Sequence, residues 1–76
     1  MTGDQEWAER IKRFLKAELK RADVTYEELA QRMTALGLEE TKASVASKLS
    51  RGGFGATFFL AALKAVGVEQ VRVLDI

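Results

Sequence analysis

Residues 25–52 read TYEELAQRMTALGLEETKASVASKLSRG, a stretch whose capping residues and apolar spacing predict two short helices joined by a turn. The first helix begins near Thr25, because a threonine followed three residues later by Glu28 has the spacing of a capping box. It ends before Gly37, since glycine adopts the left-handed conformation that follows many helix ends without strain. The predicted bounds of this helix are about residues 25–36.

The second helix of the stretch is short and comparatively polar. Thr41 is a fair N-cap, and the pair Gly52 and Gly53 ends the helix, so its predicted bounds are about residues 41–51.

Two further helices flank this pair. Upstream, about residues 5–22 carry apolar side chains at the i, i+4, i+7, i+8 spacing of one buried face. These side chains are Trp7, Ile11, Phe14, Leu15 and Leu19. Downstream, about residues 56–66 are apolar over most of the helix surface, which predicts a central core helix or a partial interface.

The remaining residues, 67–76, form a valine-rich tail. Its composition is compatible with a short strand through Val71, Val73 and Leu74, or with an extended segment. The whole chain is therefore predicted to be one all-α domain of four helices, followed by a C-terminal strand or extended tail.

Composition limits what such a chain can do. A domain of 76 residues has a core that supplies only about 3–5 kcal/mol, and this one contains no Cys and no His. Disulfides, the usual zinc ligands, the commonest neutral-pH base and the most readily activated nucleophile are therefore missing. We expect no metal, no cofactor and no enzymatic activity. With no apolar run near the roughly 18 residues of a membrane span and no signal-peptide segment, a cytoplasmic location is expected.

The helix predicted over residues 41–51 has two chemically different faces. At about 100° per residue, Val45, Ala46 and Leu49 fall on one side, and small or cationic side chains fall on the other. Serine allows close approach to base edges, while Lys and Arg read guanine or neutralise phosphate, and the N-terminal turn favours phosphate. The predicted DNA-binding residues are Thr41, Lys42, Ser44, Ser47, Lys48 and Arg51. An ordinary solvated face is the alternative interpretation.

The distribution of charge favours the same helix. The net charge is only +1, which is weak for a DNA-binding domain. No acidic residue lies between Glu40 and Glu69, although that interval contains four cations: Lys42, Lys48, Arg51 and Lys64. The positive field is therefore expected on this helix and its flank.

Two segments resemble a known family. TYEELAQRM, residues 25–33, is similar to the first helix of the helix-turn-helix unit in lambda-repressor-like regulators of the Cro and XRE type, and ASKLSRG, residues 46–52, is similar to the end of their recognition helix. The resemblance covers most of residues 7–66. It implies contacts to DNA from Lys42, Ser44, Ser47 and Lys48, with Arg51 and Thr25 nearer the phosphates. The chain departs from the family between Thr34 and Glu40, where roughly six extra residues require a longer helix or a wider turn.

A second resemblance extends over two neighbouring segments, ASVASKLSRGGF at residues 43–54 and ATFFL at residues 56–60. They are similar to short bacterial proteins catalogued as a domain of unknown function, and this likeness implies no activity.

These features predict a bacterial transcription regulator that binds double-stranded DNA sequence-specifically. A homodimer is expected because the core is small and a tail strand would lack a partner in its own chain. Pairing through Val71, Val73 and Leu74 would set two recognition helices about one DNA turn, ~34 Å, apart. The alternative is a protein-interaction module that docks through the apolar fourth helix or the tail. Neither a small-molecule ligand nor membrane contact is expected.

Overall fold

The computed structural model describes residues 2–76, which form four α-helices and one short 3-10 turn. The elements are α1 (Gly3–Ala22), α2 (Tyr26–Ala35), α3 (Lys42–Arg51), α4 (Ala56–Val66) and the turn η1 (Val73–Asp75). The all-α class is confirmed, and the helix bounds agree with the predicted ones to within two residues.

Threonine hydroxyls cap the first three helices. At α1, which begins earlier than predicted, Thr2 and Gln5 form a complete capping box. At α2, the Thr25 hydroxyl accepts the backbone N–H of Glu28 at 3.1 Å. The Glu28 carboxylate accepts the Thr25 hydroxyl proton at 3.2 Å instead of the backbone N–H, so the predicted capping box is half formed.

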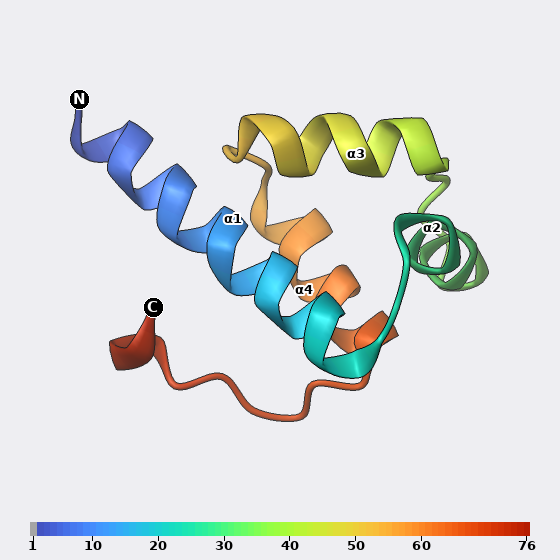
Figure 1. The fold of residues 1–76 in the computed structure, drawn as a ribbon. Helices are drawn as coiled ribbons and strands as arrows, with labels where there is room; N and C mark the ends of the chain where they lie inside the picture. Colours follow the sequence, from blue (N-terminus) through green and yellow to red (C-terminus); the bar gives the residue numbers. More distant parts are fainter. Residues whose placement is uncertain (1) are drawn as a thin grey trace.

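The four helices enclose one hydrophobic core. α3 lies across one side of the molecule above α1 and α4, and α2 is seen end-on beside the start of α3 (Figure 1). α1 and α2 each pack against both α3 and α4. Every helix contributes to the buried core, which consists of Leu15, Leu19, Val24, Leu29, Ala30, Met33, Val45, Leu49, Phe58, Ala62 and Leu63.

The N-terminal part of α1 departs from the predicted buried stripe. Leu15 and Leu19 are buried as expected, but Trp7 is 50% exposed. The first turns of α1 extend beyond the other helices (Figure 1), and the guanidinium of Arg10 lies 4.8 Å from the centre of the Trp7 ring. The predicted core role of Trp7 is therefore wrong.

The connection between α2 and α3 is wide, whereas α2 itself is short. α2 ends at Ala35, and Gly37 has the positive φ, +98°, expected after a helix end. The Thr34 hydroxyl donates to the carbonyl of Glu40 and accepts its N–H, both at 3.3 Å, which closes the connection at its base. Leu38 packs against the core. The residues in excess of the lambda-repressor-like pattern therefore lie in the turn.

The tail contains no strand within the described residues. Val68 and Val71 pack against the core, whereas Val73 and Leu74 in η1 are exposed. Of the two predicted forms of the tail, a short strand or an extended segment, the strand is not seen, since an isolated strand cannot satisfy its own backbone groups and residues 2–76 offer it no second strand. Among the same residues, no helix combines the length and apolar character required to cross a bilayer.

Candidate nucleic-acid interface

α3 is anchored on one side and at its C-terminal end. Val45 and Leu49 are fully buried beneath it. At the end of the helix, Gly52 has a φ of +75°, and a Cβ at this position would lie 2.9 Å from the carbonyl oxygen of Ala8 in α1. Both the backbone angle and the close approach require glycine here. The end of α3 thus lies directly against the backbone of α1.

Two of the predicted DNA contacts, Thr41 and Ser44, cap the N-terminal end of α3. The Thr41 hydroxyl accepts the N–H of Ser44 at 3.1 Å, and the Ser44 hydroxyl accepts the N–H of Thr41 at 2.8 Å. The Ser44 hydroxyl also donates to the carboxylate of Glu40 at 2.6 Å. Both hydroxyl groups are therefore engaged within the chain.

Lys48 is a third predicted contact that the fold engages internally. Its ammonium pairs with the Glu40 carboxylate at 2.5 Å and lies 4.9 Å from the centre of the Phe58 ring. The Glu40 side chain is only 6% exposed. Burial alone raises the pKa of Glu40, but the hydrogen bonds from Lys48 and Ser44 outweigh it, so this pKa lies below its ordinary value. Glu40 is thus ionised at neutral pH and offsets the charge of Lys48.

Of the other predicted residues, Ser47 and Arg51 lie on the side of α3 opposite Val45 and Leu49, and Lys42 lies in the first turn of α3, facing α1 and α2. All three are exposed, and within the described part of the chain their side chains make no hydrogen bond or ion pair. The sequence analysis missed Ala43 and Ser50, which are exposed on the same helix. On a helical wheel, Ala43 and Ser50 lie within about 60° of the direction opposite Val45 and Leu49, so a face centred on that direction contains both residues.

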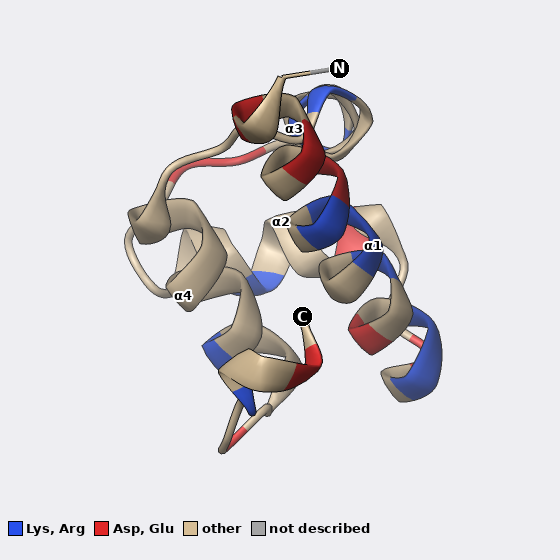
Figure 2. Ribbon diagram, turned by 90° about the vertical axis from the view of Figure 1, so that its left-hand side faces the viewer, with Lys and Arg blue, Asp and Glu red and all other residues tan. Residues whose placement is uncertain are grey.

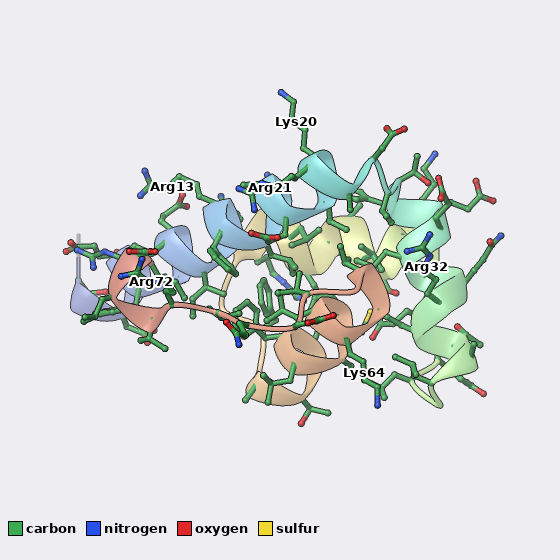
Figure 3. The ribbon with its side chains drawn as sticks, turned by 90° about the horizontal axis from the view of Figure 1, so that it is seen from below. Arg13, Lys20, Arg21, Arg32, Lys64 and Arg72 are labelled. Carbon is green, nitrogen blue, oxygen red and sulfur yellow. The ribbon has the colours of Figure 1, made fainter. Side chains whose placement is uncertain are left out.

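The exposed residues of α3 are together named the α3 ridge and are Lys42, Ala43, Ser47, Ser50 and Arg51. It carries small side chains between a lysine near one end and an arginine at the other. Figure 2 shows α3 end-on with cationic residues and no acidic ones. In the sequence, Lys64 belongs to the same acid-free interval as the cations of α3. In the structure it projects from α4, on the side away from Lys20 (Figure 3).

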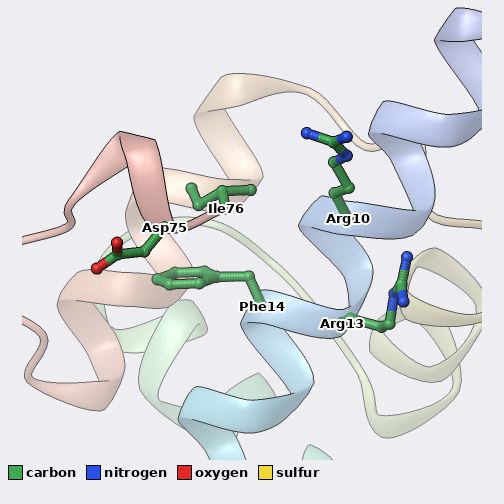
Figure 4. A pocket seen from close by; sticks show the side chains of 5 residues that line it. All are labelled: Arg10, Arg13, Phe14, Asp75 and Ile76. Atoms are coloured by element: carbon green, nitrogen blue, oxygen red, sulfur yellow. The ribbon is translucent and has the colours of Figure 1, made fainter.

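A separate hollow of about 520 Å³ lies between α1 and η1. It is lined by Arg10, Arg13, Phe14, Asp75 and Ile76, and the Phe14 ring lies beside Asp75 and Ile76 (Figure 4). None of the predicted DNA contacts lines it. It adjoins the exposed tail and does not belong to the α3 ridge.

The fold and the ridge together define a class, a small all-α domain that exposes a cationic helix side. More specifically, residues 7–71 match the family described as a domain of unknown function, DUF6471, and the chain belongs to that family. This match confirms the likeness to proteins catalogued in that way. Comparison with curated proteins and with solved structures gives no match. The family description carries no activity, so a function has to be argued from the site itself.

Proposed function

We propose that this protein binds double-stranded DNA, with α2 and α3 acting as a lambda-repressor-like helix-turn-helix unit and α3 entering the major groove. The observation that carries the proposal is the α3 ridge, which is exposed, has no acidic side chain and is narrow along Ala43, Ser47 and Ser50. Small side chains let a helix approach base edges closely, and cations at its two ends meet phosphates or guanine.

The proposed roles within α3 differ from residue to residue. Arg51 and the hydroxyls of Ser47 and Ser50 face base edges, and Lys42 in the first turn of α3 contacts phosphate. Ser44, which caps α3, supports the helix without contacting DNA. Lys48 supports it in the same way through its ion pair with Glu40. This assignment leaves three of the six residues predicted from the sequence as direct contacts.

We also infer a regulator of transcription in the bacterial cytoplasm that acts as a homodimer. Because the tail forms η1, its exposed apolar side chains are Val73 and Leu74, and Leu74 is 95% exposed. These two side chains are the part of the tail available for self-association. A two-fold dimer would present two α3 ridges to the half-sites of a palindromic operator.

The alternative function, a protein-interaction module docking through α4 or the tail, has less support at α4. Phe58 and Leu63 are buried and Phe59 is half-buried, which leaves Leu60, at 62% exposed, as the large apolar side chain on the surface of α4. A single exposed leucine is ordinary on a protein surface and does not make a docking patch.

Selection of bound sequences from random duplexes, followed by fluorescence anisotropy on the selected duplex, tests DNA binding. We expect affinity to fall as salt rises, and Arg51→Ala to weaken binding by about 1–3 kcal/mol. Lys64→Ala is the control, because it also removes one exposed cation but from α4. Absence of salt-dependent binding to any duplex, or equal losses in the two variants, would contradict the proposal.

A further inference from the structure

A hollow of about 370 Å³ lies where α1, α2 and α3 meet, beside the N-terminal end of α3. Three lysines surround it, Lys16 and Lys20 from α1 and Lys42 from the α3 ridge. The other lining residues are Leu19, Val24, Thr25 and Tyr26. None of the lining residues is acidic, so the hollow combines an apolar floor with a positively charged rim.

The three lysines differ from most other cations of the chain in having no carboxylate partner. Among the residues that the structure describes, six of the 12 Lys and Arg residues form an ion pair, namely Arg10, Lys12, Arg21, Arg32, Lys48 and Arg72. Within residues 2–76, Lys16, Lys20 and Lys42 form none, and all three are exposed. Their charges are therefore available to a ligand.

Repulsion between these three positive charges destabilises the protein when no anion is bound. Lys16 and Lys20 are four residues apart, so they are neighbours on one side of α1, where like charges weaken a helix. The fold then brings Lys42 from another helix to the same hollow. An anion bound between the three would offset this repulsion.

The position of the hollow relates it to the α3 ridge, because Lys42 belongs to both. Lys20 extends from α1 into solvent, on the opposite side of the molecule from Lys64 (Figure 3). A chain of anions that follows the edge of a groove occupied by α3 would pass from Lys42 toward α1.

We propose that this hollow binds the phosphodiester backbone of DNA next to the groove that α3 enters. The inference rests on the proposed function and adds Lys16 and Lys20 to the surface that contacts DNA. Three ammonium groups and the Tyr26 hydroxyl provide donors for phosphate oxygens, and the apolar floor at Leu19 and Val24 suits the carbon face of deoxyribose. Such contacts strengthen binding and fix its register without reading sequence.

The test compares two double variants in binding to the selected duplex over a range of salt concentrations. Lys16→Gln/Lys20→Gln removes two charges at the hollow, and Lys64→Gln/Arg72→Gln removes two elsewhere. Each lost phosphate contact makes the slope of log K against log[salt] shallower by about 0.9. The slope of Lys16→Gln/Lys20→Gln should therefore be shallower than that of wild type by about 1.8, and the slope of the control should equal that of wild type. Base preference should be unchanged in both variants. The urea midpoint of unfolding should fall in neither, and should rise slightly in Lys16→Gln/Lys20→Gln, which removes a like-charge pair from α1.

The outcomes separate this inference from the function on which it rests. If wild-type protein binds duplex and the Lys16→Gln/Lys20→Gln slope equals that of wild type, the hollow is not a phosphate site, but DNA binding stands. If wild-type protein binds no duplex, both proposals fail. A parallel NMR titration with tripolyphosphate distinguishes the source of the phosphate. Amide shifts across residues 16–26 that arise with tripolyphosphate but not with duplex would overturn the assignment to DNA.

Discussion

Replacing Lys48 by alanine tests whether this side chain holds the fold together. The helical wheel alone puts Lys48 beside Arg51 on a free face, so alanine at either position should leave stability unchanged. The structure predicts a difference. Lys48 is paired with Glu40 and lies against the Phe58 ring, whereas the exposed Arg51 side chain makes no hydrogen bond or ion pair with any described residue.

The magnitude follows from the contacts that each variant loses. A hydrogen bond between charged groups contributes about 1.5–3 kcal/mol, and a cation over an aromatic ring adds about 0.5–1 kcal/mol. The Lys48 side chain is 33% exposed, which favours the low end of both ranges. We therefore expect Lys48→Ala to lose about 2 kcal/mol, and Arg51→Ala no more than about 0.5 kcal/mol. At about 4–8 °C per kcal/mol in a domain of this size, the Lys48 variant should melt about 8–16 °C lower.

Urea unfolding followed by far-UV circular dichroism measures these differences. Glu40→Ala and the Glu40→Ala/Lys48→Ala double variant complete a cycle that isolates the ion pair, for which we expect a coupling of about 1 kcal/mol or more. A Lys48 variant as stable as the Arg51 variant, or a coupling near zero, would show that Lys48 is a solvated side chain after all.

Three further predictions concern the end of α3, the Glu40 carboxylate and the tail. Gly52→Ala should destabilise the protein by about 1–3 kcal/mol because of its positive φ and its contact with α1. Gly55→Ala should lower the urea midpoint less, because Gly55 has a negative φ and open space around it and loses only the preference for glycine over alanine at the N-cap of α4. Because the pKa of Glu40 is lowered in the folded protein, its ionised form contributes stability above about pH 4.3 that is lost as pH falls through the folded value. Glu40→Gln should accordingly be less stable than wild type at neutral pH, and the gap in urea midpoints should narrow as pH falls through the lowered folded-state pKa of Glu40, whereas a gap independent of pH would contradict the assignment. Leu74→Asp should shift the sedimentation coefficient from dimer to monomer, and a wild-type protein that is already monomeric at micromolar concentration, with and without DNA, would remove the dimer.

The helix bounds were predictable because the signals that set them are local. Thr25 and Thr41 cap the N–H group three residues ahead, and Gly37 follows directly on a helix end. The buried residues of α3, Val45 and Leu49, were predictable for a similar reason, since one helical period relates them.

The partner of Lys48 was missed because Glu40 lies in the connection before α3, where a helical wheel does not apply. A signal was nevertheless present in the spacing. Glu40 stands four residues before Ser44 and eight before Lys48, so the three align when the spiral of α3 is continued backward by about one turn.

The sequence left the tail open between a strand and an extended segment, because valine favours a strand only where a neighbouring strand or a packed surface is available. Val71 packs against the helical core instead, and Val73 is the first residue of η1. Composition alone could not distinguish a strand that finds a partner from a segment that lies along helices.

The two hydrogen bonds between the Thr34 hydroxyl and the backbone of Glu40 identify a site where foreign sequence can be inserted. These bonds hold the base of the connection, so residues inserted between Leu38 and Glu39 would enlarge the loop without displacing the start of α3. Doubling the length of a flexible loop costs only about 0.6 kcal/mol. An epitope or a lanthanide-binding peptide inserted there would tag the protein close to the N-terminal end of α3.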